Sequence, residues 1–215
     1  VAGGERSTGD RSDLVLPGVQ DALLQALEAT GTPMVVVLLN GSAVAVNWAH
    51  EHAEAIVEAW YPGEEGGTAI ADVLFGDVNP AGRLPVTFYQ SVDHLPPFRD
   101  YAMAGHTYRF FAGEPLYAFG HGLSYTTFAY RDLTLGDAEV EAGQCVDLEV
   151  TVVNTGDRAG DEVVQIYVRD EAASVPVPIR QLKGFRRIQL EPGEAQTVRF
   201  CVMPMDMAMV SDEGK

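Results

Sequence analysis

Acidic residues that stand beside glycines are the groups best suited to chemistry in this sequence, and they are concentrated in residues 60–85. Pro62-Gly63 turns the chain, and Glu64 and Glu65 follow at the expected start of a helix, where carboxylates favour the positive end of the helix dipole. Glycines just before a helix let a ligand approach the backbone closely, but tight packing of a helix on a sheet requires the same residues. The segment is therefore either a ligand-binding turn or a packing turn.

Other familiar patterns for catalysis or metal binding are absent from the sequence. Gly63–Gly67 lacks the lysine and the Ser/Thr of a phosphate-binding loop, and no serine-hydrolase nucleophile elbow occurs. His50 and His52 lie two residues apart near acidic residues, but no third ligand is spaced to complete a metal site. We therefore expect neither a metal nor a cofactor.

The elements expected to position these residues alternate between strand and helix. Continuous apolar runs predict buried strands covered on both faces, and apolar residues at helical spacing predict the helices between them. Such alternation indicates a parallel or mixed sheet with helices on both faces, an α/β three-layer sandwich. The predicted elements are a helix over 19–27 closed by Gly31, strands over 34–39 and 55–60, a helix from Glu64 to a left-handed C-cap at Gly76, and a strand over 84–88.

From Thr127 onward the pattern changes to short strands of alternating apolar residues, separated by turn signals such as Asn154–Asp157 and Glu191–Glu194. This pattern is typical of a β-sandwich. The predicted strands cover 128–135, 145–154, 162–169, 180–188 and 196–202.

The chain therefore divides into three parts in this interpretation. Residues 1–90 form the α/β domain, 91–126 an ordered linker rich in proline and aromatic residues, and 127–215 the β-sandwich. The sheet begins in mid-strand at Val1, and the sandwich has five clear strands where seven are expected. We interpret the sequence as one portion of a longer chain.

Composition excludes several classes of partner. Among 215 residues, 14 basic and 31 acidic side chains give a net charge of −17, which repels phosphate backbones and anionic lipid. We therefore expect no nucleic acid partner and no membrane surface, and a neutral ligand fits the charge. No apolar run reaches the length of a membrane span, no signal peptide is recognisable, and neither compartment nor oligomeric state follows from the sequence.

The two cysteines, Cys145 and Cys201, are too few for a disulfide framework and both fall on the polar faces of their predicted strands. If these strands pair antiparallel, the start of the first lies near the end of the second, so a bridge between them is geometrically conceivable. Because a disulfide also needs a narrow Cα separation, we expect two free thiols.

Residues 60–85 resemble a known signature in order and identity. The C-terminal α/β domain of glycoside hydrolase family 3 usually reads Trp-x-Pro-Gly-x-x-Gly-Gly-x-Ala-x-Ala-Asp-Val-Leu-x-Gly-Asp-x-Asn-Pro-x-Gly-Arg-Leu-Pro, and more than a dozen of these positions agree. Residues 11–18, 38–41 and 119–128 match further segments in the order of that family, so the resemblance covers nearly the whole chain. Residues 127–215 resemble the fibronectin type III-like domain that follows in many members.

The resemblance implies hydrolysis of glycosidic bonds by two carboxyl groups, a nucleophile and a proton donor. The nucleophile of this family is an aspartate on a preceding (β/α)8 barrel, which this sequence lacks, so the chain alone should not carry a complete active site. The proton donor in many members is a glutamate shortly before the pair that matches Asp10-Arg11. Glu5 is the only acidic residue between Val1 and Asp10 and is the candidate acid/base.

Many relatives place that glutamate three residues before the aspartate, where Ser7 stands here. Several xylosidase-type relatives carry two glutamates, the earlier of which matches Glu5 in spacing. The alternative for Glu5 is an ordinary exposed loop residue. Asp10 and Arg11 either reach substrate hydroxyls or form a local ion pair, and Glu65 either accepts from a sugar hydroxyl at the barrel interface or only stabilises the helix dipole.

The substrate class follows from two further segments. Residues 105–111 resemble the Gly-Arg-Thr-Tyr-Arg-Tyr/Phe segment of β-xylosidase-type members, and residues 175–180 favour the same group, whereas β-glucosidase-type members share every other motif. The resemblance implies the C-terminal portion of a retaining exo-β-glycosidase, most closely a β-xylosidase, that acts on an oligosaccharide or aryl glycoside together with the barrel of the same protein. The alternatives are a β-glucosidase and a non-catalytic scaffold or carbohydrate-contact module, which Ser7 favours; the α/β half disfavours a purely structural adhesion protein.

Overall fold

The computed structural model describes residues 12–137, 139–141 and 143–208. They divide into two compact units. Unit 1 contains the described residues up to Asp77 together with 85–107 and 112–119, and unit 2 contains 78–84, 108–111 and the residues from Gly120 onward. The chain therefore passes between the units several times, and residues 60–85 are shared between them.

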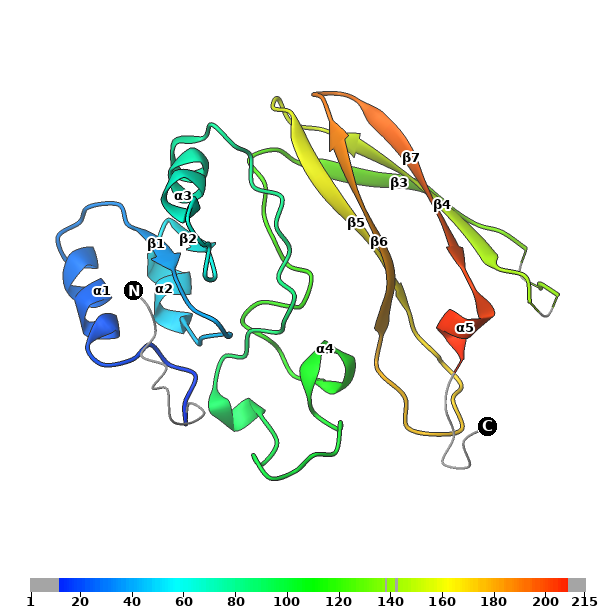
Figure 1. Ribbon diagram of the computed structural model, residues 1–215, viewed down its shortest axis with the longest axis horizontal. Coiled ribbons are helices and arrows are strands. Elements are labelled where there is room, and N and C mark those ends of the chain that lie inside the picture. Colours follow the sequence, from blue (N-terminus) through cyan, green and yellow to red (C-terminus); the bar gives the residue numbers. More distant parts are fainter. Residues whose placement is uncertain (1–11, 138, 142, 209–215) are drawn as a thin grey trace. The chain divides into compact units, whose positions relative to one another are not determined.

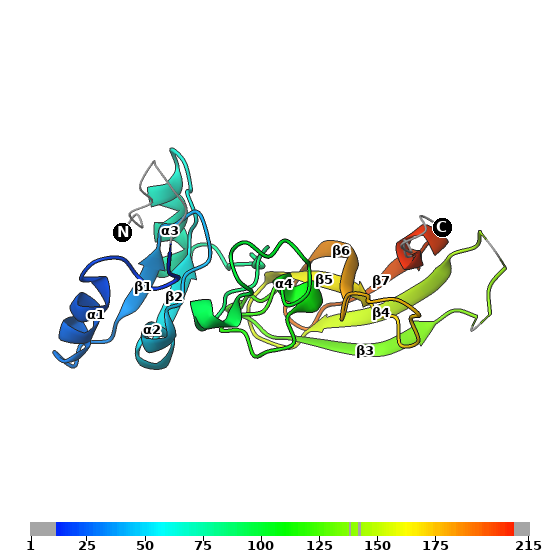
Figure 2. The same cartoon turned by 90° about the horizontal axis from the view of Figure 1, so that it is seen from below.

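Unit 1 is built on two parallel strands, β1 (Val35–Leu38) and β2 (Ala55–Glu58), which pair in register. Its longer helices are α1 (Gln20–Glu28), α2 (Asn47–His52) and α3 (Gly66–Phe75), and Figures 1 and 2 show α2 beside the strands. The predicted α/β alternation is confirmed. The short helix α2 was not predicted, because fewer than two turns show little helical periodicity.

The two predicted strands of unit 1 are present, but not covered on both faces within the described residues. In β1, Val36 is 8% exposed while its neighbour Val35 is 48% exposed. Such alternation is the pattern of a strand with one buried face.

The helix predicted within residues 60–85 is confirmed at its C-terminal end. Gly76 is the C-cap of α3 in the left-handed conformation (φ 84°), which suits glycine because it has no Cβ. The strand predicted over 84–88 is wrong. Pro85 has no N–H to donate, Leu84 exchanges backbone hydrogen bonds with His121 and Gly120, and only Phe88 forms a bridge, with Tyr117.

The residues expected to form a linker are mostly irregular in structure. They contain a 3-10 turn, η1 (Val92–His94), and a single helical turn, α4 (Thr107–Phe110). Residues of this segment belong to both units.

Unit 2 is a sandwich of two antiparallel sheets, with strands as predicted to within two residues. One sheet has the order β3-β4-β7 and the other pairs β5 with β6 (Figures 1 and 2). The strands are β3 (Phe128–Leu135), β4 (Val146–Asn154), β5 (Gly160–Val168), β6 (Gln181–Leu190) and β7 (Ala195–Val202), and a short helix, α5 (Pro204–Met207), follows.

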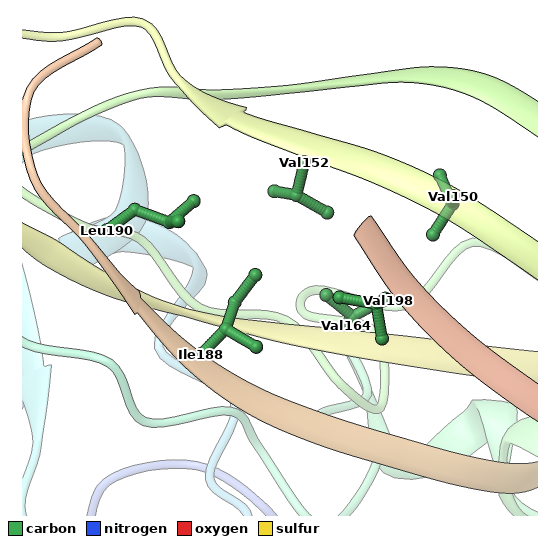
Figure 3. Packing of buried hydrophobic residues seen from close by; sticks show 6 residues of the cluster. All are labelled: Val150, Val152, Val164, Ile188, Leu190 and Val198. Carbon is green, nitrogen blue, oxygen red and sulfur yellow. The ribbon is translucent and has the colours of Figure 1, made fainter. Parts of the chain in front are cut away.

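The core of unit 2 lies between the two sheets. Aliphatic side chains from β4, β5, β6 and β7 meet there, and Figure 3 shows them pointing toward one another. Val152 and Leu190 are wholly buried. The cluster consists of Val150, Val152, Val164, Ile188, Leu190 and Val198.

The prediction of two free thiols is wrong, because Cys145 and Cys201 form a disulfide. Strands β4 and β7 pair antiparallel, and Asp147 lies opposite Cys201. Cys145 directly precedes β4, and its Cα lies 5.4 Å from that of Cys201, within the range that a disulfide requires. The strand periodicity revealed the shared face but not this separation.

Candidate functional site

Of the site residues predicted from the sequence, only Glu65 lies among the described residues. Glu5, Asp10 and Arg11 lie outside them. The candidate site that the structure describes is therefore the part of unit 1 at the carboxyl ends of β1 and β2. In open parallel sheets, ligands bind beyond this edge.

Asn40 and Glu58 form a polar pair at that edge. The Asn40 side-chain amide donates to a Glu58 carboxylate oxygen at 3.2 Å and to the Ser42 carbonyl at 2.8 Å. Asn40 is 6% exposed, and its Oδ1 is buried without a hydrogen-bond partner. Because a buried carbonyl oxygen is stabilised by accepting a hydrogen bond, this atom is an acceptor that the described protein groups leave unused.

Glu58 also holds the turn that follows β2. Its other carboxylate oxygen accepts the Trp60 N–H at 2.9 Å, and Trp60 adopts a left-handed φ of 52°, which is unfavourable for a residue with a bulky side chain. The Trp60 ring packs edge to face on Phe88 at 6.0 Å between centroids. This hydrogen bond and the ring contact together support the strained backbone of Trp60 directly after β2.

The pKa of Glu58 lies above its ordinary value. Burial raises this pKa, and the hydrogen bonds from the Trp60 backbone and the Asn40 side chain lower it by less. Glu58 therefore takes up a proton more readily than an exposed glutamate. Neither Glu58 nor Asn40 was predicted as a site residue; the available signal was a carboxylate and an amide at the ends of two apolar strands.

Beyond the turn lies an open apolar hollow of about 410 Å³. A Cβ on Gly41 would come 2.7 Å from the Tyr61 ring, and a Cβ on Gly66 would collide with Pro62. A Cβ on Gly67 would contact nothing within 4 Å. Gly41 and Gly66 thus satisfy packing, whereas Gly67 leaves open space. The hollow is lined by Leu39, Tyr61, Pro62, Gly63, Gly66, Gly67 and Ile70.

Glu65 precedes the first turn of α3 as its N-cap residue, and its side chain is exposed. The side chain makes no capping hydrogen bond to the helix backbone. One carboxylate oxygen accepts the Thr68 hydroxyl at 3.1 Å. The carboxylate therefore keeps acceptor capacity for a ligand hydroxyl while it lies near the positive end of the helix.

The two neighbouring histidines do not converge on a common point. His50 Nδ1 lies 2.9 Å from the Tyr117 hydroxyl, whereas His52 Nδ1 lies 2.8 Å from the Trp48 carbonyl and its ring stacks on Trp48. Both residues therefore have structural partners in unit 1.

The second half of residues 60–85 is anchored within unit 2. Arg83 forms an ion pair with Glu162 at 2.8 Å, with both side chains 12% exposed, and the Tyr130 hydroxyl donates to the other Glu162 oxygen at 2.8 Å. Asn79 Nδ2 donates to the Ala159 carbonyl at 3.0 Å. Asn79 and Arg83 therefore hold residues 78–84 against the sandwich of the same unit.

The contact with Glu162 also changes the pKa of Tyr130. Burial and the neighbouring Glu162 carboxylate raise its phenol pKa far above the ordinary value. Tyr130 is thus fixed as a hydrogen-bond donor to Glu162 rather than a titrating group.

The chain matches two family models. Residues 1–125 match the glycosyl hydrolase family 3 C-terminal domain, and residues 162–215 match the fibronectin type III-like domain. The periplasmic β-glucosidase of Salmonella typhimurium is 44% identical over 209 residues, which is 92% of this chain and 27% of the relative. The xylan 1,4-β-xylosidase of Xylanibacter ruminicola is 46% identical over 195 residues, which is 89% of this chain and 22% of the relative.

Solved structures give the same result. A β-glucosidase from Erythrobacter marinus matches with a TM-score of 0.86 and 44% identity, over 97% of this chain and 28% of that one. The β-glucosidase of Listeria innocua in complex with glucose matches with a TM-score of 0.85 and 31% identity, over 96% of this chain and 30% of that one. The chain thus spans less than a third of the length of these proteins. It belongs to glycoside hydrolase family 3, of which it carries the C-terminal domain followed by a fibronectin type III-like domain.

Proposed function

We propose that this chain is the C-terminal portion of a retaining exo-β-glycosidase that removes terminal β-linked sugars from oligosaccharides or aryl glycosides. The observation that carries the proposal is the order of the two domains, a family 3 C-terminal domain followed by a fibronectin type III-like domain. The same chain is 44% identical to a protein named β-glucosidase and 46% identical to one named β-xylosidase. In this proposal a barrel elsewhere in the same protein supplies the aspartate nucleophile.

Glu5 is the acid/base of this proposal. In a retaining mechanism the acid protonates the leaving oxygen while the nucleophile attacks, and the resulting carboxylate then removes a proton from the water that releases the sugar. Glu5 is supported by its position in the sequence before Asp10-Arg11, since no other acidic residue precedes Asp10. Asp10 and Arg11 contact substrate hydroxyls in the same proposal.

Glu65 is proposed as a further substrate contact. Its exposed carboxylate has one oxygen bonded to Thr68 and retains capacity to accept from a sugar hydroxyl. Glu64 stands next to it in sequence and provides a matched control. We expect Glu65→Gln to lower kcat/KM of the intact enzyme about tenfold, the effect of weakening one charged hydrogen bond, and Glu64→Gln to leave it unchanged. Equal effects in steady-state kinetics would assign both residues to the helix dipole alone.

The sugar is proposed to be xylose, with glucose as the alternative. Residues 105–111 and 175–180 resemble xylosidase-type members, and relatives carry both names. The ratio of kcat/KM for p-nitrophenyl β-xyloside and β-glucoside decides between them. A ratio above one supports the xylosidase assignment, and a ratio below one reverses it.

A non-catalytic carbohydrate-contact module is the second candidate, favoured by Ser7 in the usual glutamate position. The discriminating experiment compares the isolated chain with the chain joined to the residues encoded upstream of Val1. The first proposal predicts no turnover of either aryl glycoside by the isolated chain and turnover by the joined form. A folded joined form that binds sugar but hydrolyses neither substrate would favour the module.

A further inference from the structure

Four side chains with metal-ligating atoms gather at the end of the β4–β7 ladder. Asp147 lies on β4 and Cys201 on β7, whereas Cys145 directly precedes β4 and Met203 directly follows β7. The ladder pairs Asp147 with Cys201 and ends at the pair of Val146 with Val202, so Cys145 and Met203 each lie one residue beyond its end. Three of these residues, Cys145, Asp147 and Cys201, bring their ligand atoms together at the end of the ladder, and Met203 lies beside Cys201.

The donor atoms are close enough to share one ion. The Cys145 sulfur lies 3.6 Å from Asp147 Oδ1, and the Cys201 sulfur lies 3.6 Å from the Met203 sulfur. The two cysteine sulfurs and the carboxylate oxygen all lie within 4.8 Å of one another. In the structure the sulfurs are joined as a disulfide, which offers no thiolate to a cation.

The geometry points to a redox-gated cation site: on reduction, the thiolates of Cys145 and Cys201 bind a thiophilic divalent cation, of which Zn²⁺ is the natural candidate, together with the carboxylate of Asp147. Thiolates select such cations over Mg²⁺ or Ca²⁺, and Zn²⁺ accepts sulfur and carboxylate oxygen in a four-coordinate shell. The Met203 thioether or a water completes four ligands.

Electrostatics favour occupation of this site. Two thiolates and a carboxylate bring three negative charges together, and the whole chain carries a net charge of −17. A divalent cation relieves the local repulsion. The disulfide relieves it in the oxidised form by removing both thiolates.

The redox step needs an external reductant of the thiol or phosphine class. A dithiol donates two electrons and two protons, so that the S–S bond breaks, two protein thiols form and the dithiol becomes a disulfide. With a phosphine, water supplies the oxygen of the phosphine oxide and the two protons. Cation binding then displaces the two thiol protons.

The test titrates Co²⁺ into the chain after reduction with a water-soluble phosphine and its removal under argon. We expect a thiolate-to-cobalt absorption band that saturates at one equivalent and disappears when Zn²⁺ displaces Co²⁺. The chain that keeps its disulfide should show no band. This readout is independent of glycosidase activity, so the inference stands or fails separately from the proposed function.

Two variants assign the ligands. Asp147→Asn keeps both cysteines and should weaken Zn²⁺ binding by the reduced chain by at least about tenfold, the effect of losing an anionic ligand. Glu149→Gln makes the same charge change two residues along β4, where the carboxylate pairs with Arg199, and should change the affinity less than threefold. Equal affinities of the two variants, or no cobalt band in the reduced chain, would overturn the site.

Circular dichroism of the reduced chain tests whether reduction of the disulfide unfolds unit 2. If reduction unfolds unit 2, one equivalent of Zn²⁺ should restore the strand signal, because binding free energy then becomes folding free energy. If the reduced chain stays unfolded with Zn²⁺, the cation site is overturned and Cys145–Cys201 serves only as a structural disulfide.

Discussion

Arg83 and Glu162 lie 79 residues apart in sequence and form the least exposed ion pair among the described residues. Removing one partner leaves the other charge buried, which costs far more than the net contribution of the pair. The pair gives the arginine of the signature a structural role, since it fixes residues 78–84 on the sandwich of the same unit. Its role is structural at the residue scale.

Arg83→Met should lower the free energy of unfolding of unit 2 by about 3 kcal/mol, because Glu162 then keeps only the Tyr130 hydroxyl. Arg199→Met is the control, since it breaks an exposed pair with Glu149 in the same unit and should cost less than about 1 kcal/mol. Urea unfolding followed by circular dichroism measures both. Similar losses in the two variants would show that burial adds nothing to the Arg83 pair.

The raised pKa of Glu58 predicts a pH dependence of stability. Between the ordinary glutamate pKa, about 4.3, and the higher folded pKa, the folded state holds a proton that the unfolded state has lost. Stability of wild type relative to Glu58→Gln should therefore fall as pH rises through this window and then level off. Thermal unfolding of unit 1 at a series of pH values checks this, with Glu54→Gln as an exposed control. A wild-type stability that instead rises through the window would mean that the hydrogen bonds to Glu58 outweigh its burial.

At the scale of elements, the strands of unit 2 could be predicted because alternation along each strand directly reflects its one buried face. The end of α3 could be predicted from Gly76 for a similarly local reason. The strand expected over 84–88 failed because its backbone partners, His121 and Gly120, lie far away in sequence. Local patterns reveal local geometry, and pairing between distant segments decides the rest.

Two glycines of α3 should respond oppositely to alanine. Gly67→Ala should stabilise unit 1 by about 0.5–1 kcal/mol, because its Cβ meets nothing and alanine favours the helix. Gly76→Ala should destabilise unit 1 by about 1 kcal/mol, because alanine is strained at φ 84°. Chemical denaturation of the two variants should place them on opposite sides of wild type. Shifts of the same sign would contradict the assigned C-cap.

The disulfide ties β4 to β7 across a sequence separation of 56 residues. From the loop-closure model, the Cys145→Ser, Cys201→Ser double variant should lose up to about 4 kcal/mol of stability in metal-free buffer. A phosphine should lower the unfolding temperature of the oxidised wild type and leave that of the double variant unchanged. If the phosphine leaves the unfolding temperature of wild type unchanged while thiol labelling proves that the disulfide is reduced, the disulfide does not stabilise the fold.

At the scale of the whole molecule, the family and the two kinds of fold could be predicted from contiguous motifs, whereas the division of residues 60–85 between two units could not. Asn79 and Arg83 belong to the α/β signature in sequence, yet the partner of Arg83, Glu162, lies on β5, and the partner of Asn79, Ala159, directly precedes that strand. Glu65 was predicted as a site residue from the sequence, whereas Asn40 and Glu58 were not, because their contact depends on the pairing of β1 with β2.

The helices in the part of the chain that the structure describes are all too short or too polar to span a membrane.

The central proposal is that Glu5 serves as the acid/base of a retaining glycosidase completed by a barrel. The direct measurement is the product that the joined enzyme carrying Glu5→Gln forms from an aryl β-glycoside in azide, with Ser7→Ala, two residues along the sequence, as the matched control. We expect a rate about 100-fold or more below wild type, recovery by azide, and a β-glycosyl azide product, because azide attacks the glycosyl-enzyme without needing a base. Turnover by Glu5→Gln that equals wild type, with the free sugar as sole product, would contradict it.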